Sequence, residues 1–81
     1  MKTEFSLRAA RDYKNLSPEL KALVRKQLNL LRDNLRHPSL HAKKYGGTDD
    51  VWQGRVNRDY RFYFKITDNS YHIISIVPHP R

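Results

Sequence analysis

Two arginines and a histidine are the residues of this sequence best suited to chemistry on a phosphate ester. Arg55 and Arg61 lie six positions apart in a segment where polar and apolar residues alternate, and His79 lies close to the end of the sequence. A guanidinium group stays protonated and can donate two hydrogen bonds to the oxygens of one phosphate. An imidazole can accept and release a proton near neutral pH. Together these side chains could stabilise charge on a phosphate and transfer a proton without a metal ion.

A second set of polar and basic residues surrounds the two arginines. If both arginines lie on one face of a sheet, strand alternation places Gln53, Tyr63 and Lys65 on that same face. A tyrosine ring can stack on an unpaired base while cationic groups bind the backbone. We therefore predict an RNA-binding surface; the alternative is a solvated basic face on which the tyrosine packs against its neighbours. The candidate RNA-binding residues are Gln53, Tyr63, Lys65, Lys43, Lys44 and Arg81.

The charge balance indicates a polyanionic partner. The 81 residues include 16 Lys and Arg but only 8 Asp and Glu, which gives a formal net charge of +8. Such a surface attracts nucleic acid or an acidic protein. No run approaches the roughly 20 apolar residues that a membrane span needs, and Lys2, Glu4 and Arg8 interrupt any signal peptide. Because cysteine is also absent, we expect a cytoplasmic protein that binds no membrane.

Other chemistries fit the sequence poorly. The four histidines stand at positions 37, 41, 72 and 79, and Pro38 breaks the helix that would bring His37 and His41 to one side. No carboxylate stands at ligand spacing from the last two. The pair Gly46-Gly47 resembles a turn rather than a phosphate-binding loop, and no serine follows the pattern of a nucleophile elbow. We expect no metal and no cofactor, and we interpret the first three histidines as surface residues.

The first elements are predicted to be a short strand and a short helix. Residues Lys2–Phe5 have the pattern of a strand, with Phe5 as its buried anchor. Residues 6–15 follow as a helix. The predicted inner face of this helix carries Leu7, Ala10 and Tyr13, which recur at helical spacing.

A long amphipathic helix comes next. Ser17 is a favoured N-cap residue, Pro18 suits the first helical position, and Glu19 is an early acid. The helix is predicted to end at His37-Pro38, because the residue before a proline disfavours helical geometry. Its apolar stripe, at spacings of three and four, consists of Leu16, Leu20, Leu23, Val24, Leu28, Leu31 and Leu35.

The second half of the sequence shows the alternation of β-strands. Residues 39–50 are polar and form a loop, in which a short strand is predicted around Lys43–Tyr45. Strands are predicted at Val51–Asn57, Tyr60–Thr67 and Tyr71–Val77, with turns at 58–59 and 68–70. Short turns imply antiparallel hairpins, and the last strand is apolar on both faces, as expected of a central strand. The predicted helix-facing residues are Trp52, Gly54, Val56, Tyr60, Phe62, Phe64 and Ile66.

These elements add up to one small α+β domain. A sequence of 81 residues supports one core and leaves no room for a second. The predicted domain spans residues 1–81 and consists of a short N-terminal strand followed by two helices packed on a twisted antiparallel sheet. The predicted order of elements is β-α-α-β-β-β.

The order and spacing of several segments resemble the RelE/ParE toxin superfamily. In the segment Trp52–Phe64, an apolar strand with a basic residue turns into a strand that opens with an aromatic residue and an arginine, and this is similar to the family's hairpin. Residues His37–Leu40 and Lys43–Gly46 resemble the linker between the long helix and the sheet. Residues Ile74–His79 resemble the last strand. The resemblance covers nearly the whole sequence and implies a RelE-like fold.

The resemblance also implies the toxin of a type II toxin–antitoxin pair. The RelE branch consists of ribosome-dependent endoribonucleases that cut messenger RNA and so inhibit translation and growth. Carried over to this sequence, Arg61 matches the family's recurrent functional arginine, and Arg55 matches a basic position of the catalytic surface. His79 matches the histidine that YoeB-like members use as general acid or base. The implied partners are a cognate antitoxin, bound in a hetero-oligomer, together with messenger RNA and the ribosome.

The sequence departs from the family pattern in three places. A tyrosine often follows the terminal histidine, whereas Pro80 and Arg81 follow it in this sequence. Some members carry two lysines where Gln53 and Arg55 stand. No acid obviously matches the general base of YoeB-like toxins. Two alternatives therefore stay open: a ParE-like inhibitor of DNA gyrase, and a non-catalytic module that only binds its antitoxin.

Overall fold

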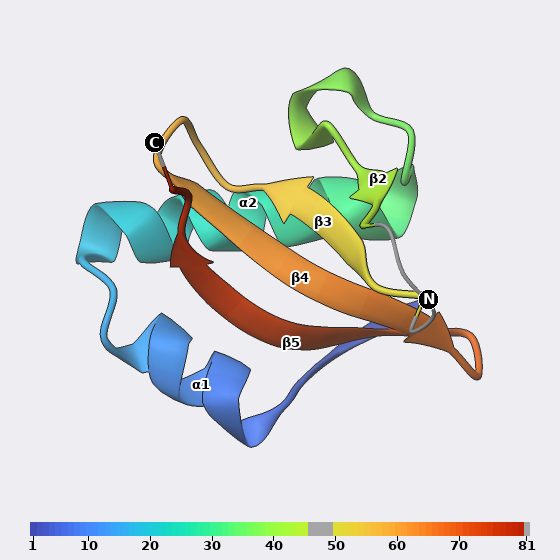
Figure 1. Ribbon diagram of the computed structural model, residues 1–81, viewed down its shortest axis with the longest axis horizontal. Helices are drawn as coiled ribbons and strands as arrows, with labels where there is room; N and C mark the ends of the chain where they lie inside the picture. Colours follow the sequence, from blue (N-terminus) through green and yellow to red (C-terminus); the bar gives the residue numbers. More distant parts are fainter. Residues whose placement is uncertain (46–49, 81) are drawn as a thin grey trace.

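Two helices pack against a five-stranded sheet (Figure 1). The computed structural model describes residues 1–45 and 50–80. In chain order the elements are β1 (Lys2–Phe5), α1 (Leu7–Lys14), α2 (Pro18–Asp33), the 3-10 helix η1 (Pro38–Leu40), β2 (Lys43–Lys44), β3 (Trp52–Arg55), β4 (Tyr60–Thr67) and β5 (Ser70–Pro78). The predicted α+β architecture is confirmed. None of the described helices is long and apolar enough to cross a membrane.

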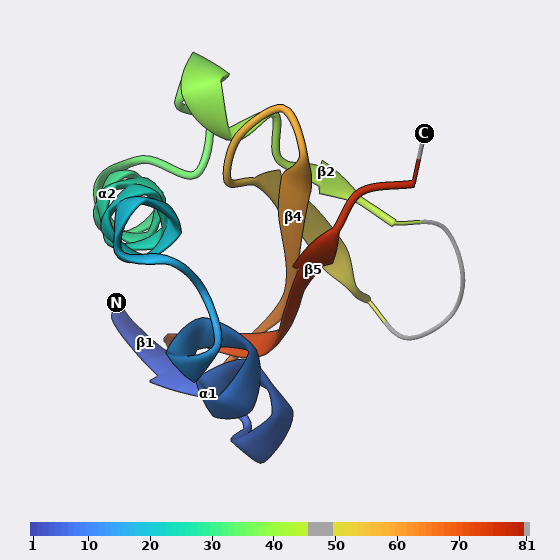
Figure 2. The ribbon, with the colours of Figure 1, turned by 90° about the vertical axis from the view of Figure 1, so that its left-hand side faces the viewer.

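The sheet is mixed rather than purely antiparallel. Its strand order is β1-β5-β4-β3-β2. The antiparallel pairing predicted for β3, β4 and β5 is confirmed, but β1 runs parallel to β5, with Lys2 opposite Ser70 and Phe5 opposite Ile73. A parallel pair needs a long crossover connection, and the helices and hairpins between β1 and β5 supply it. In Figure 2, α2 lies on one side of the sheet and α1 lies along β5, and no described helix covers the other side.

Serine side chains fix where both helices begin. The Ser6 hydroxyl accepts a hydrogen bond from the backbone N–H of Ala9 at 3.0 Å. The Ser17 hydroxyl accepts one from the N–H of Leu20 at 3.2 Å, and proline follows it at the first helical position. Each bond satisfies a backbone donor that a helix terminus otherwise leaves without a partner. The predicted start of the long helix is confirmed.

The long helix ends about one turn earlier than predicted. Its last residue is Asp33, and the next residue, Asn34, is extended, with a φ of −160°. His37 begins a separate element instead, because its Nδ1 accepts a hydrogen bond from the N–H of Ser39 at 3.2 Å and caps η1. His37-Pro38 therefore lies at the start of η1 and not at the end of the long helix.

The core lies between the long helix and the inner face of the sheet. Six large side chains are less than 2% exposed, namely Val24, Leu31, Leu40, Phe62, Phe64 and Ile73. Full burial of such a side chain stabilises the fold by about 1.5–3 kcal/mol. The apolar stripe predicted for the long helix therefore faces the core.

The predicted inner face of α1 is wrong for Leu7 and Ala10, whereas Tyr13 packs against the core as predicted. Leu7 is 84% exposed and Ala10 is exposed, whereas Ala9 is fully buried. The helix continues the edge of β5 beyond the end of β1, and the Asp12 carboxylate accepts a hydrogen bond from the N–H of Ile76 at 3.0 Å. The side of α1 that packs against the rest of the protein therefore carries Ala9 and not Leu7.

The first strand is confirmed over Lys2–Phe5, but its predicted buried anchor is wrong. Phe5 is 37% exposed and lies at the rim of the core. Its ring packs edge-on against Tyr13 of α1, with 5.8 Å between the ring centroids. Because β1 is an edge strand, its last side chain has neighbours on one side only.

Glycine at position 54 lets an aromatic ring pack directly on β3. Gly54 lies opposite Phe62, and a Cβ atom added at Gly54 would lie 2.3 Å from Cζ of that ring. Phe62 in turn stacks against Phe64, with 5.5 Å between the ring centroids, and Trp52 also stacks against Phe64 at 6.1 Å. The predicted inner position of Ile66 is only partly correct, since it is 37% exposed where the core ends near the β4–β5 turn.

Candidate functional site

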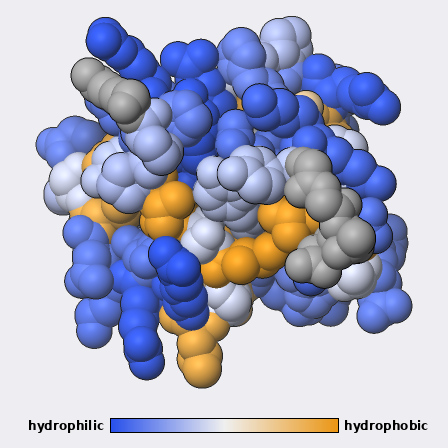
Figure 3. Space-filling view, in the orientation of Figure 1, coloured by the Kyte–Doolittle hydropathy of each residue, from blue (hydrophilic) through white to orange (hydrophobic). Residues whose placement is uncertain are grey.

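The predicted site lies on the face of the sheet opposite α2, which we call the open face. Phe62 and Phe64 point into the core, so Arg61 and Tyr63, which alternate with them, point to the open face. The strand register extends this face across four strands in a row formed by Lys43, Gln53, Tyr63 and Ser75. Seen from this side, hydrophilic residues cover most of the surface around a band of apolar atoms (Figure 3).

The two arginines are direct cross-strand partners on the open face. Arg55 ends β3 and lies opposite Arg61, near the start of β4. Cross-strand partners share a face and have Cβ atoms about 4.5–5.5 Å apart, so the predicted shared face is confirmed. Burial, and after it the positive charge of Arg55, lowers the pKa of the Arg61 guanidinium. Arginine still stays protonated at neutral pH, and the pair is therefore a concentrated positive charge that a bound anion would stabilise.

The turn between β3 and β4 holds Arg61 in place. Nη1 of Arg61 donates to the carbonyl oxygens of Asn57 at 2.6 Å and Tyr60 at 3.0 Å. The Asn57 side chain orders the turn, because its Oδ1 accepts from the N–H groups of Asp59 at 2.8 Å and Tyr60 at 2.9 Å. A guanidinium fixed in this way loses less conformational entropy when it binds a ligand.

His79 lies beside the same turn. Its backbone N–H donates to the carbonyl oxygen of Asp59 at 2.8 Å. Val77 lies opposite Arg61, so two residues later His79 continues the same side of β5. Its Nδ1 is buried and has no hydrogen-bond partner among the described residues. A buried ring nitrogen of this kind calls for a ligand, a water molecule or a catalytic role to explain it.

A second histidine, His41, lies beside Arg55 of the arginine pair. The sequence pattern did not predict a place for it at the site. Its Nε2 lies 3.4 Å from Nη1 of Arg55. His41 caps the end of η1 in the left-handed region, with a φ of 46°. It is exposed, as predicted, but the polar loop around it has no periodicity from which its proximity to the arginine could be inferred. Its position next to a guanidinium makes it a candidate for proton transfer.

Gln53 and Tyr63 are engaged with their neighbours. Gln53 is only 8% exposed, and its Oε1 accepts a hydrogen bond from the Tyr63 hydroxyl at 3.3 Å. The Tyr63 ring also packs edge-on against Tyr45, with 5.5 Å between the centroids. Both lie on the predicted face, but the tyrosine packs as the alternative interpretation describes. Base stacking on Tyr63 stays a prediction.

The lysines of the predicted RNA-binding set do not gather at one point. Lys65 lies opposite His72, four residues along β4 from Arg61 and hence about 13 Å away at about 3.3 Å per residue. Lys43 lies opposite Gln53 on the open face. Of these two lysines, only Lys43 lies in the row that crosses the open face.

Lys44 does not share that face. It lies opposite Trp52, which belongs to the inner side of β3, and its Nζ pairs with the Asp50 carboxylate at 3.2 Å. Adjacent strand residues point to opposite faces, so two consecutive lysines cannot both contact one surface. The predicted role of Arg81 and the predicted turn at Gly46-Gly47 lie outside the described residues.

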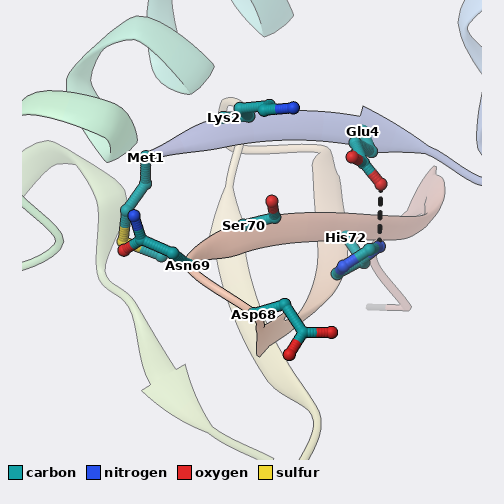
Figure 4. A pocket seen from close by; sticks show the side chains of 7 residues that line it. All are labelled: Met1, Lys2, Glu4, Asp68, Asn69, Ser70 and His72. Carbon is teal, nitrogen blue, oxygen red and sulfur yellow. Dashed lines mark ion pairs between the residues drawn. The ribbon is translucent and has the colours of Figure 1, made fainter.

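A surface pocket lies at the other end of the sheet, by the β4–β5 turn (Figure 4). Its volume is about 630 Å³, and it is lined by Met1, Lys2, Glu4, Asp68, Asn69, Ser70 and His72. Nδ1 of His72 lies 3.4 Å from Oε2 of Glu4 across β5 and β1. In residues 1–45 and 50–80 no three His, Asp or Glu side chains gather closely enough to hold a metal ion. The length of β4 separates this pocket from the arginine pair.

Comparison with known proteins identifies the fold but not a sequence family. No protein-family model matches the chain, and no curated protein matches it by sequence. Among solved structures, it is similar to the YoeB/ParE toxin from Agrobacterium tumefaciens, with a TM-score of 0.82 and 15% identity over 99% of this chain and 100% of that one. The E. coli RelBE toxin–antitoxin complex matches with a TM-score of 0.78 and 19% identity over 99% and 98% of the two chains.

The YoeB–YefM toxin–antitoxin complex from Staphylococcus aureus matches with a TM-score of 0.80 and 21% identity over 99% and 98% of the two chains. The chain has the fold of the RelE and YoeB toxins. The resemblance found in the sequence is thus confirmed at the level of the RelE-like architecture. In the E. coli and S. aureus structures, toxin and antitoxin form a complex.

Proposed function

We propose that this chain is the toxin of a type II toxin–antitoxin pair and that it cleaves RNA at the open face without a metal ion. The observation that carries the proposal is the cross-strand pair of Arg55 and Arg61. His41 lies beside one arginine, and His79 lies beside the turn that holds the other. The RelE-like fold supports the assignment to the toxins of toxin–antitoxin pairs. The net charge of +8 suits an RNA substrate.

In the proposed reaction, the 2′-hydroxyl of the RNA loses its proton and its oxygen bonds to the adjacent phosphorus. The bond from phosphorus to the 5′-oxygen then breaks, and that oxygen gains a proton. The products are a 2′,3′-cyclic phosphate and a 5′-hydroxyl. Arg55 and Arg61 bind the phosphate oxygens and stabilise the negative charge that develops on them. One preorganised donor of this kind is worth about 3–4 kcal/mol in the transition state.

We assign the two proton transfers to the imidazoles of His41 and His79. His41 accepts the proton of the 2′-hydroxyl, since its Nε2 lies next to the guanidinium that binds the phosphate. His79 donates a proton to the departing 5′-oxygen from the other end of the arginine pair. Positioned acids and bases of this kind accelerate a reaction by about 10²–10⁴-fold each.

The proposed substrate is messenger RNA on the ribosome, and the proposed place of action is the cytoplasm. Exposed lysines such as Lys43 add phosphate contacts around the arginine pair. An antitoxin neutralises the chain in a hetero-oligomer by occupying the basic surface that RNA needs, because an acidic segment is favoured there by the same charges. Blocking the open face is sufficient to prevent cleavage.

The test is incubation of the purified chain with messenger RNA, both free and bound to ribosomes, in the presence of EDTA. We expect defined cuts that carry a 5′-hydroxyl, and a loss of at least 100-fold in rate for Arg61→Ala. Arg36→Ala is the control, because Arg36 is exposed, lies beyond the end of α2 and belongs to no strand of the sheet. This variant should cut at the wild-type rate.

Two outcomes would contradict the proposal. If no RNA is cut but DNA supercoiling by gyrase is blocked, the chain is a gyrase inhibitor on the same fold. If neither activity appears and expression in cells causes no growth arrest, the chain is a non-catalytic binding module.

A further inference from the structure

We propose that Gln27 of α2 is a positioning residue that holds Arg55 and His41 together, an inference that rests on the proposed function. Gln27 is 5% exposed, and its Nε2 donates two hydrogen bonds. One goes to the carbonyl oxygen of Arg55 at 2.8 Å and the other to that of Ser39 at 3.1 Å. A single amide thus connects the long helix to the end of β3 and to η1.

Packing alone does not explain why a glutamine occupies position 27. Val24, Leu28 and Leu31 on the same helix are buried and apolar. An amide in such a place is costly unless it is hydrogen-bonded. Both of its N–H groups are used, and both bonds go to backbone carbonyl groups outside α2. The amide therefore fixes the position of two other chain segments relative to the helix.

Those two segments carry the side chains that meet at the site. Arg55 is itself one acceptor of the amide, and His41 follows the other acceptor, Ser39, by two residues at the end of η1. Their side chains come within 3.4 Å of each other. A reacting group displaced by about 1 Å can lose a hundredfold in rate. Gln27 acts through these two residues and does not itself contact the RNA.

The first test compares Gln27→Met with Leu31→Ala. Methionine keeps the length and shape of glutamine but donates no hydrogen bond, whereas Leu31→Ala removes packing from the same helix and leaves both bonds intact. We expect Gln27→Met to lower the RNA-cleavage rate at least tenfold. Leu31→Ala should lower the melting temperature at least as much as Gln27→Met does. Its RNA-cleavage rate should nevertheless stay within twofold of wild type.

A double-variant experiment separates positioning from general destabilisation. In a background that already carries Arg55→Ala and His41→Ala, Gln27→Met should cause less than a twofold further loss in kcat/KM, because the residues through which it acts are gone. A merely structural role predicts the same tenfold loss in either background, and that result would overturn the proposal.

A second readout does not depend on cleavage. In the wild-type protein, NMR should detect a nuclear Overhauser effect between the His41 ring and the Arg55 side chain. It should disappear in Gln27→Met and persist in Leu31→Ala. If the wild-type chain cuts no RNA, the proposed function fails while this measurement still decides the positioning.

Gln27→Asn covers the case in which Gln27→Met does not fold. Its amide is one methylene shorter and cannot reach both carbonyl oxygens, so it should also weaken the Overhauser effect and the cleavage rate. If either variant folds and retains both the wild-type Overhauser effect and the wild-type cleavage rate, Gln27 does not position the site.

Discussion

Arg55 and Arg61 face each other across β3 and β4, so two like charges share one face of a small sheet. Like charges directly opposite each other destabilise a sheet, and the lowered pKa of Arg61 partly reflects this proximity. The carbonyl oxygens of the β3–β4 turn offset part of the cost by accepting hydrogen bonds from Arg61. Under the proposed function, a phosphate bound between the two guanidinium groups would offset the rest.

A double-mutant cycle tests whether the two arginines bind one phosphate. We expect Arg55→Ala and Arg61→Ala each to lower kcat/KM for RNA cleavage by about 10²–10³-fold. The double variant should lose less than the product of the two effects, because both side chains act on the same group. Losses that multiply would indicate two separate anion sites. Urea unfolding provides the control, and each variant should stay within about 1 kcal/mol of wild type.

His79→Gln should abolish most of the proton transfer without unfolding the protein. We expect a fall in the cleavage rate of about 10²–10⁴-fold. His72→Gln is the matched control, since His72 lies in β5 at the pocket near the β4–β5 turn, far from His79 just beyond the other end of that strand, and pairs with Glu4 (Figure 4). Comparable losses in both variants would remove His79 from the proposed mechanism.

Gly54→Ala should destabilise the fold through a clash with the Phe62 ring. The added methyl group would lie 2.3 Å from Cζ of Phe62, and overpacking of this kind costs about 1–3 kcal/mol. Urea unfolding measures the loss. In a Phe62→Leu background the same change should cost less than it does in wild type, because the ring is gone. An equal cost in both backgrounds would locate the strain elsewhere.

The stability of the protein at high pH depends in part on Tyr71. This side chain is 4% exposed, and burial raises the pKa of its phenol. The raised value favours the neutral form in the folded state. Its contribution is therefore complete below the ordinary tyrosine pKa of about 10 and is lost as the pH rises above that value. The free energy of unfolding should fall from about pH 9 to about pH 11 more steeply in wild type than in Tyr71→Phe. Parallel curves would contradict this assignment.

Strand alternation predicted most of what positions the arginine pair. Phe62 and Phe64 alternate with Arg61 and Tyr63, and this local pattern fixes which side of β4 faces the core. The bounds of β4 agree with the prediction over Tyr60–Thr67. The predicted turn is too short: β3 ends at Arg55 rather than Asn57, and residues 56–59 connect it to β4. A two-residue turn at 58–59 would place Arg55 opposite Phe62, whereas the register places it opposite Arg61.

Contacts between distant segments could not be predicted in this way. His41 reaches Arg55 from an aperiodic loop, and Gln27 joins that loop to β3 from within a helix whose pattern indicates only burial. The exposure of Leu7 has the same origin, because the contact between α1 and β5 selects the face of the helix that carries Ala9. Propensity and periodicity describe one helix or strand by itself. The surroundings of His41, Gln27 and Leu7 depend instead on how neighbouring elements pack.

The parallel pairing of β1 with β5 has a consequence for the order of events during synthesis. Each residue of β1 lies beside a partner that is 68 positions further along the chain. On a translating ribosome, the first strand therefore has no partner until almost all of the described sheet has been made. The hairpin that carries the arginines can form before then, but the strand that leads to His79 cannot. The arginine pair and the histidine of the proposed mechanism therefore come together only once the last described strand has been made.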